Sequence, residues 1–401
     1  MKFAITTLGC KVNQYDSQRI KEALRSGGHE EQSFTAPGAD CYIINTCSVT
    51  HRSDADGRKL VRQALRHGGR VIVTGCQAAV YPGDIQELSE TVEVIPYEDL
   101  ASYLGVVLPS AVTGFEGHSR AFVQVQGGCD NFCTYCIVPH ARGKPWSRPW
   151  EDIVSEINML SLCGYKEVVL CGINIGLFEG GLTALIHRIL AHTSIPRVRI
   201  SSVEPWTVED ELIEIVSQDP RVCKHLHLPL QSGSDRILSG MGRPYTAGYY
   251  RDLVSKVRSA SVDVAIGSDI MVGFPGEDQS CFGETNSLLQ DLDITYLHVF
   301  PYSARPGTPA ATYASQVDAA VKRDRARILR DLSRKKRDTF IRSQVGSTGD
   351  VIVTNTNGDS FSGITSNYLR VHVTGSAAVN DLVRICLVDY AGGVVTGRAC
   401  G

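Results

Sequence analysis

Residues 129–136 read CDNFCTYC, so Cys129, Cys133 and Cys136 share one short loop with CxxxCxxC spacing. Three thiolates on such a loop can hold three irons of a [4Fe-4S] cluster and leave the fourth iron open. A closed structural zinc site needs four ligands, and no fourth cysteine or adjacent histidine completes this loop, although His140 follows nearby. The spacing therefore favours an iron-sulfur loop over a zinc site or unligated thiols.

The chain around this loop alternates between strand-like and helix-like patterns. Apolar runs typical of buried strands occur at residues 121–126, 167–171, 197–202, 225–230, 264–271 and 294–301. Amphipathic stretches typical of helices include residues 151–162, 208–218, 246–259 and 278–292. Six strand-helix units favour a partial (β/α)6 barrel, in which ligands bind at the carboxyl ends of the strands. We expect the cysteine loop, directly after the first strand, to lie at that end.

The first hundred residues show a second, shorter alternation, with apolar runs at residues 2–8, 41–45, 70–74 and 92–96. This pattern predicts an open parallel α/β domain. Cys10, Cys47 and Cys76 each follow one of these runs. Because the carboxyl ends of parallel strands share one edge of the sheet, the three thiols are expected to converge there.

The C-terminal quarter begins with a long predicted helix, residues 316–342. Between Lys322 and Arg342 it carries ten Lys or Arg against three Asp, an excess of seven positive charges. Such a stripe is either a solvated helix face or a phosphate-binding surface. Short alternating runs at residues 350–354, 368–374, 381–389 and 393–397 then favour a small all-β barrel. The predicted domains are residues 1–110, 115–342 and 343–401.

Composition limits the class of protein. The chain has 401 residues, 43% hydrophobic and 21% charged, with a formal net charge of -3, so any nucleic acid must meet a local basic patch. No export signal or membrane-spanning apolar stretch is apparent, and we expect a cytoplasmic protein without membrane contact. Thirteen cysteines in a reducing compartment favour metal ligation over disulfides. The seven cysteines outside the two sets are expected to be small buried apolar residues. Oligomeric state has no signal in the sequence.

The CxxxCxxC loop after a first barrel strand resembles the radical S-adenosylmethionine superfamily. That resemblance implies S-adenosylmethionine bound at the open iron and cleaved to a 5'-deoxyadenosyl radical, with Cys129, Cys133 and Cys136 as catalytic cluster ligands. Tyr135 matches an aromatic position near the adenine of the cofactor, although a packed loop aromatic is the alternative. A Gly-Gly-Glu found in many such enzymes is replaced by Leu170-Cys171-Gly172, so the contacts there are open.

The N-terminal motifs narrow the resemblance to the methylthiotransferases. These motifs are Gly9-Cys10-Lys11-Val12-Asn13, Asn45-Thr46-Cys47-Ser48-Val49-Thr50 and Thr74-Gly75-Cys76. The resemblance implies a second [4Fe-4S] cluster on Cys10, Cys47 and Cys76. It continues through motifs ending at Glu204-Pro205, Gln231-Ser232-Gly233 and Gly276-Glu277, and the C-terminal segment around Gly363–Tyr368 resembles the RNA-binding TRAM domain.

Further site residues follow from their positions in these motifs. Glu204 and Gln231 are candidates for binding S-adenosylmethionine. Arg142 and Arg148 are candidates for substrate phosphate, or alternatively form salt bridges at the barrel rim.

The resemblance implies a tRNA methylthiotransferase that acts on the anticodon loop and needs an external electron donor and a sulfur source. Lys11-Val12 and Ser48-Val49-Thr50 resemble the branch that modifies N6-threonylcarbamoyladenosine at position 37 to its 2-methylthio derivative. The alternatives are isopentenyladenosine in tRNA, an aspartate of a ribosomal protein, or a non-catalytic iron-sulfur RNA-binding or sensor protein.

Overall fold

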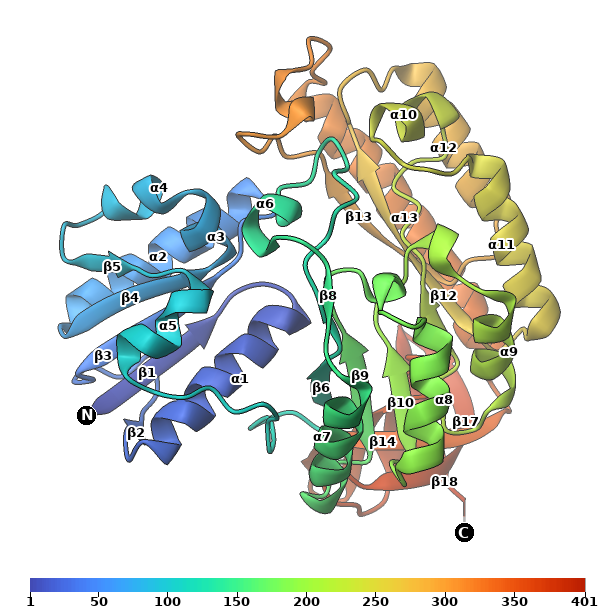
Figure 1. Cartoon of the computed structure of the whole chain (residues 1–401). Coiled ribbons are helices and arrows are strands. Elements are labelled where there is room, and N and C mark those ends of the chain that lie inside the picture. The colour runs from blue at the N-terminus through green and yellow to red at the C-terminus, as the bar shows by residue number, and fades with distance from the viewer. Residues whose placement is uncertain (401) are drawn as a thin grey trace.

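Three β-structured regions organise the chain, and a computed structural model describes residues 1–400. Figure 1 shows an N-terminal sheet with helices on both faces, a central half-barrel, and a small β-barrel beneath the half-barrel. The predicted fold class is therefore confirmed: an open parallel α/β domain, a partial (β/α)6 barrel and an all-β barrel.

The N-terminal sheet has the order β2-β1-β3-β4-β5, and every strand pair in it is parallel. Its strands alternate side chains to two buried faces, so Phe3 and Ile5 pack on the side of α1 and α5, while Ala4 packs on the side of α2 and α4. The elements are β1 (Lys2–Thr7), α1 (Lys11–Ser26), β2 (Glu30–Glu31), β3 (Cys41–Thr46), α2 (His51–His67), β4 (Arg70–Gly75), α3 (Cys76–Val80), α4 (Pro82–Gln86), β5 (Val92–Val94) and α5 (Tyr97–Leu104).

The half-barrel consists of two parallel three-stranded sheets, β10-β9-β6 and β11-β12-β13, which meet through a bridge between Ser202 and His227. Its elements are β6 (Ala121–Gln124), β7 (Gln126–Gly127), α6 (Val138–Arg142), β8 (Trp146–Ser147), α7 (Trp150–Leu162), β9 (Glu167–Cys171), α8 (Leu182–His192), β10 (Arg197–Ile200), α9 (Asp210–Gln218), β11 (His225–His227), α10 (Asp235–Gly240), α11 (Ala247–Ala260), β12 (Ala265–Val272), α12 (Gln279–Asp291) and β13 (Tyr296–Pro301). Short 3-10 turns lie at Ile175–Leu177, Pro205–Thr207 and Pro309–Thr312.

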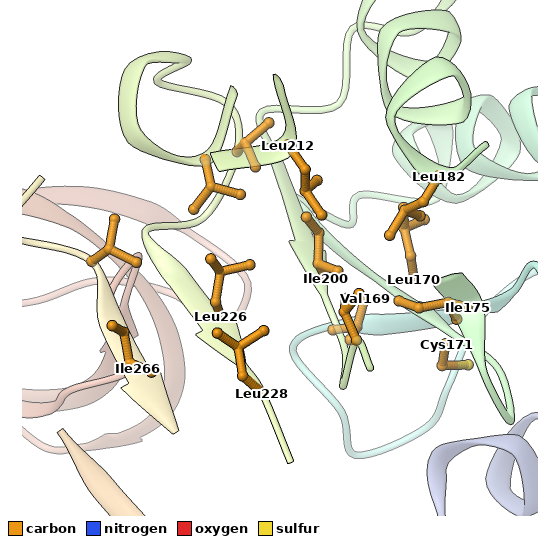
Figure 2. Close-up of a cluster of buried hydrophobic side chains, with 14 of the residues drawn as sticks. Val169, Leu170, Cys171, Ile175, Leu182, Ile200, Leu212, Leu226, Leu228 and Ile266 are labelled. Atoms are coloured by element: carbon orange, nitrogen blue, oxygen red, sulfur yellow. The ribbon is translucent and has the colours of Figure 1, made fainter. Parts of the chain in front are cut away.

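A continuous apolar core holds this half-barrel together. Figure 2 shows Leu182 of α8 beside Leu170 of β9, with Leu226 and Leu228 on the neighbouring sheet. All four side chains are buried, and burying each contributes about 2 kcal/mol. The strands therefore form a rigid frame for the loops at their carboxyl ends.

The C-terminal barrel closes in the order β14-β15-β16-β18-β17. Its strands are β14 (Thr348–Asn357), β15 (Ser360–Thr365), β16 (Arg370–Thr374), β17 (Leu382–Ala391) and β18 (Val394–Ala399), and α13 (Ala319–Gln344) leads into it. The prediction from the sequence missed β15. Three of its six residues are Ser or Thr and one is a glycine, so it does not form an apolar run. The helix α13 joins two cores, because Leu329 packs in the half-barrel and Phe340 and Ile341 pack in the C-terminal barrel.

Several element ends differ from the sequence prediction for local reasons. The helix α13 begins at Ala319 rather than residue 316, because the Asp318 side chain accepts a hydrogen bond from the backbone N–H of Ala320 and caps it. Strand β11 ends at His227 rather than residue 230, and Gln231 then adopts a left-handed backbone with φ of 70°.

The seven remaining cysteines divide by position. Cys41, Cys171, Cys223 and Cys281 are buried, as expected for small apolar residues, and Cys386 is half-buried. The expectation was wrong for Cys163 and Cys400, which are exposed because one ends α7 and the other follows β18.

No helix within residues 1–400 combines the length and the apolar character that a bilayer crossing requires.

Candidate functional site

The CxxxCxxC loop follows β6 and the short β7, at the carboxyl end of the half-barrel. Its backbone is held from three sides: Cys129 N–H donates to the Gly143 carbonyl at 3.0 Å, Thr134 N–H to the Met241 carbonyl at 3.0 Å, and Ala310 N–H to the Thr134 carbonyl at 2.9 Å. Cys133 is buried, whereas Cys129 and Cys136 are partly open. The loop is thus preorganised, with Cys133 the most buried of its three cysteines.

Arg243 and Glu204 lie directly beside this loop. Arg243 Nη2 pairs with Glu204 Oε2, and Arg243 Nη1 donates to Cys133 Sγ at 3.4 Å. Burial raises the pKa of Glu204, and the nearby guanidinium of Arg243 opposes that rise. Glu204 therefore reaches the cluster loop through Arg243 and is partly committed to that ion pair.

A cavity of about 340 Å³ lies between the cysteine loop and the N-terminal domain. Tyr135 and Cys136 line one side, Val49 and Thr50 line another, and Gln231 also faces it. The Gln231 side-chain oxygen Oε1 is buried without a hydrogen-bond partner. An unsatisfied buried acceptor costs about 1–3 kcal/mol, so Oε1 of Gln231 is suited to a ligand that supplies a donor.

The second cysteine set forms as the parallel topology predicts. Strands β1, β3 and β4 are neighbours, and Cys10, Cys47 and Cys76 follow their carboxyl ends. Burial raises the pKa of Cys76 to about 11, Arg142 opposes the rise, and the charges of Cys10 and Cys47 add to it. The three thiols are thus near enough to influence one another.

A glycine turn and an asparagine side chain hold these thiols at the edge of the sheet. Gly75 has φ of 86°, and a Cβ there would lie 2.2 Å from Oδ1 of Asn45, so only glycine permits the turn before Cys76. Asn13 links the first two strand ends, because its Nδ2 donates to the Thr46 carbonyl at 2.8 Å while its Oδ1 faces Cys10 Sγ at 3.4 Å. The strand-end set is therefore fixed by the sheet.

The spacing of the thiols bears on which metal group they can hold. One tetrahedral zinc ion with ligand bonds of about 2.3 Å needs sulfurs about 3.8 Å apart. Potential metal ligands are His nitrogens, Cys sulfurs and carboxylate oxygens. Among residues 1–400, only His227, Asp269 and His298 bring three of these atoms within 4.8 Å of one another. Neither cysteine set meets this criterion for a single ion.

Arg142 and Arg148 contact protein groups of the N-terminal domain and the half-barrel. Arg142 donates to Asp16 Oδ2 at 2.7 Å and to Asn13 Oδ1 at 2.7 Å. Arg148 donates to Glu156 Oε2 at 2.6 Å and to the Tyr15 hydroxyl at 2.9 Å. Both guanidiniums form the salt bridges that the alternative interpretation expects, and a contact of either with substrate phosphate stays a prediction.

The basic helix α13 is divided between internal and exposed cations. Lys336 donates to the Leu292 carbonyl at 2.6 Å, Arg330 to the Val299 carbonyl at 3.0 Å, and Arg325 is buried against Glu277. The exposed cations are Arg323, Arg327, Arg330, Arg334, Lys335, Arg337 and Arg342, although Arg330 also bonds the Val299 carbonyl. Only this second group is available to an external anion.

Sequence reasoning missed a group of aromatic side chains in the half-barrel. His225 and His227 on β11, together with Tyr296 and His298 on β13, form a wall of rings with neighbouring centroids 5.1–6.2 Å apart. The signal was present as two alternating triplets, His225-Leu226-His227 and Tyr296-Leu297-His298, because alternate residues of a strand share one face.

Comparison with known proteins assigns this architecture to a family. Residues 2–96 match the model described as Uncharacterized protein family UPF0004, and residues 123–289 match the Radical SAM superfamily. The chain is 34% identical to the threonylcarbamoyladenosine tRNA methylthiotransferase MtaB of Bacillus subtilis, covering 93% of this chain and 90% of that protein. It is also 34% identical to the tRNA-2-methylthio-N(6)-dimethylallyladenosine synthase of Maricaulis maris, with coverage of 93% and 91%.

A solved structure supports the fold. The radical S-adenosylmethionine methyltransferase TsrM of Kitasatospora setae aligns with a TM-score of 0.57 at 15% identity, over 77% of each chain. The radical S-adenosylmethionine match contains the CxxxCxxC loop and the UPF0004 match contains Cys10, Cys47 and Cys76, and the relatives match both regions together. The chain therefore belongs to the radical S-adenosylmethionine methylthiotransferase family.

Proposed function

We propose that this protein transfers a methylthio group to N6-threonylcarbamoyladenosine at position 37 of tRNA. One observation carries the proposal: residues from both cysteine regions line the same cavity of about 340 Å³. Val49 and Thr50 come just after Cys47, while Tyr135 adjoins Cys136 in the loop. A base inserted into this cavity would lie between the two sets.

Each cysteine set is assigned one [4Fe-4S] cluster. Cys129, Cys133 and Cys136 would hold the cluster that binds S-adenosylmethionine, and Cys10, Cys47 and Cys76 would hold a second one that carries the sulfur. When bound, the first cluster and S-adenosylmethionine supply a 5'-deoxyadenosyl radical, with electrons from an external donor. The assignment is supported by the two family matches, because residues 2–96 contain one cysteine set and residues 123–289 contain the other.

Three further side chains are assigned to S-adenosylmethionine. Gln231 offers its unpartnered Oε1 to a hydroxyl or amino donor of the cofactor, and Tyr135 provides an aromatic surface in the same cavity. Glu204 acts at the edge of the site, where Arg243 orients its carboxylate beside Cys133. The apolar residues Met271 and Phe300 complete the cavity and exclude water from the reacting atoms.

RNA is expected to approach along the C-terminal barrel and the exposed cations of α13. A base can enter the cavity only if it leaves its stack, and this requirement suits a single-stranded loop. Unpaired cations such as Arg337 would hold the phosphates of that loop.

Two observations bear on which adenosine derivative is the substrate: the names of the relatives and two short motifs. Four relatives named MtaB are 33–35% identical to this chain, and relatives named for dimethylallyladenosine are 31–34% identical. The motifs Lys11-Val12 and Ser48-Val49-Thr50, which flank Cys10 and Cys47, resemble the threonylcarbamoyladenosine branch. We therefore prefer that nucleoside over isopentenyladenosine.

The test is expression of the gene in a host that lacks both tRNA methylthiotransferases, followed by mass spectrometry of tRNA nucleosides. The 2-methylthio derivative of N6-threonylcarbamoyladenosine should appear, and that of isopentenyladenosine should not. Appearance of only the isopentenyl derivative, or methylthiolation of only a ribosomal protein, would contradict the substrate assignment. Absence of 5'-deoxyadenosine from the reduced holoenzyme with S-adenosylmethionine would instead favour a sensor.

A further inference from the structure

A second cavity, of about 350 Å³, lies where the half-barrel meets the C-terminal barrel. Residues before β6, on β13, on α13 and in the loop before β16 line it. Its lining shares no residue with the cavity between the cysteine sets, so it is a separate site. A volume of this size lies in the range of about 300–1,000 Å³ that holds small ligands.

The lining is strongly cationic. It includes Arg120, Arg334, Arg337 and Arg370. Arg120 lies 3.7 Å from Glu167, and Arg334 pairs with the neighbouring Asp331. Arg337 and Arg370 have no carboxylate within ion-pair distance in the part of the chain that the structure describes. The cavity therefore has positive charge in excess and favours an anionic ligand.

The opposite wall of the cavity is aromatic. It is continuous because the residue between two of its rings is a glycine, which has no side chain. Gly267 of β12 lies between β11 and β13, in register with His227 and Tyr296. A Cβ at Gly267 would approach the Tyr296 ring to 2.4 Å and His227 Nδ1 to 2.7 Å. Glycine at this position thus lets rings from two non-adjacent strands meet across the strand between them.

Tyr368 closes the wall from the C-terminal barrel. Its ring stacks on His225 with centroids 4.8 Å apart, and the guanidinium of Arg199 lies 4.8 Å from the Tyr368 centroid. The backbone of Tyr368 is left-handed, with φ of 69°, a strained conformation for a residue other than glycine. Such a strained conformation persists only where the packed surroundings impose it, and it is found most often at functional sites.

His298 provides the exposed ring of the wall. Its side chain is 62% exposed, and its Nδ1 lies 3.4 Å from Asp269 Oδ1. The same carboxylate oxygen is 3.0 Å from His227 Nε2. Asp269 therefore lies within ion-pair distance of both imidazoles, and His298 presents its ring to the cavity.

We propose that this cavity binds one unpaired nucleotide of the RNA loop other than the nucleotide being modified. The base stacks against Tyr296 and His298, and its phosphate lies on Arg337 and Arg370. This inference rests on the proposed function in taking RNA as the substrate. Cationic grooves with stacking rings are the usual means of holding single-stranded nucleic acid, and a neighbour held here would keep the target base splayed out.

The experiment measures binding of synthetic anticodon stem-loops to reconstituted holoenzyme as a function of salt. The double variant Arg337→Gln, Arg370→Gln should lower the slope of log affinity against log salt by about 0.7, the value for one phosphate of a single strand. Lys256→Gln is the matched control, because Lys256 is an exposed cation of α11, away from both α13 and the cavity lining, and should leave the slope unchanged.

The base contact is tested by removing bases one at a time from the loop. An abasic site at one position other than the modified adenosine should weaken wild-type binding by at least about fivefold, the low end for one stacked base. With His298→Ala, the same abasic site should have little further effect. Iron content serves as the folding control for every variant, and His298 is exposed enough to be replaced safely.

Three outcomes would overturn the inference: an unchanged salt slope in the arginine double variant, equal abasic sensitivity with and without His298, or coupling that falls on the modified adenosine itself. The proposed function is tested separately. A different methylthio nucleoside in tRNA would leave the stem-loop coupling intact, whereas correct nucleoside formation without coupling would remove only this inference.

Discussion

The two cysteine sets reach comparable arrangements by different routes. Cys129, Cys133 and Cys136 lie in a single loop whose own hydrogen bonds hold it in place. Cys10, Cys47 and Cys76 are far apart in sequence and meet because three adjacent parallel strands end at one edge. The first set depends on local backbone and the second on a whole sheet, so they should fail independently and for different reasons.

The largest expected effect comes from removing each set in turn. Replacing Cys129, Cys133 and Cys136 by alanine should halve an iron content of about eight per chain and abolish 5'-deoxyadenosine formation. Replacing Cys10, Cys47 and Cys76 should remove the other half, leave cleavage measurable and abolish methylthio transfer. Iron analysis and product chromatography provide the measurements. Loss of all iron in either folded triple variant would contradict two independent sites.

A backbone change should break the strand-end set without touching a thiol. Gly75→Ala places a Cβ 2.2 Å from Asn45 Oδ1 at a φ of 86°, and left-handed strain plus the clash should cost about 4 kcal/mol. Half of the iron should be lost while S-adenosylmethionine cleavage survives.

Gly68→Ala is the control for this change, because it has φ of 76° with no atom within 4 Å of the added Cβ. It should cost only about 1 kcal/mol and keep full iron content. Equal iron loss in both variants would show that the sheet edge is less constrained than its geometry indicates.

A substitution distant from both cysteine sets should lower stability without changing iron content, and it serves as a reference for the variants above. Burial alone would raise the pKa of Glu167, but Arg197, Arg199 and Arg120 outweigh it and lower the pKa from 4.5 to about 2. Arg199 in turn donates to the Thr365 and Ser366 carbonyls of the C-terminal barrel. Glu167→Gln should therefore destabilise the protein by about 3 kcal/mol at pH 7 with no change in iron content.

The pH dependence of this effect has a definite sign. Because the folded-state pKa of Glu167 is depressed, its contribution is complete above about pH 4.5 and is lost as the pH falls toward 2. Denaturation of the metal-free protein at pH 6 and pH 3 should show the difference between wild type and Glu167→Gln shrinking. If the difference in unfolding free energy is the same at both pH values, the effect of Glu167 does not come from its ionisation.

The smallest expected effect concerns the connection between the two sets. Arg142→Lys keeps the charge but loses the forked contact with Asp16 and Asn13 that ties the segment after the CxxxCxxC loop to the N-terminal domain. The ratio of 5'-deoxyadenosine to methylthio product should rise about tenfold. Methylthio transfer depends on the relative position of the two cysteine sets, whereas cleavage of S-adenosylmethionine needs only one of them. Arg236→Lys, an exposed pair with Asp278, should leave the ratio unchanged.

The sequence predicted what local spacing and strand topology determine. The CxxxCxxC loop is readable from eight residues, and the convergence of Cys10, Cys47 and Cys76 follows once the sheet is parallel. Partners of long side chains were not readable. Arg142 and Arg325 look like free cations in the sequence, and only the packed structure shows Asp16 and Glu277 opposite them.

The aromatic wall was unpredictable for a related reason. His227 and Tyr296 lie on strands separated by β12, and their contact depends on Gly267 in register between them. An alternating triplet shows that its rings share one face of a strand. It does not show which strand lies beside it, because that depends on sheet order.

The helix α13 sets a distance between two regions of the molecule. The segment before it bonds the CxxxCxxC loop through Ala310 and Thr134, and Gln344 at its end accepts a hydrogen bond from Asn367 of the C-terminal barrel. Figure 1 shows the helix running between these regions. At about 1.5 Å per residue, its 26 residues span about 39 Å. The helix therefore fixes the separation between the half-barrel and the C-terminal barrel, and under the proposed function an RNA that contacts both regions must span that separation.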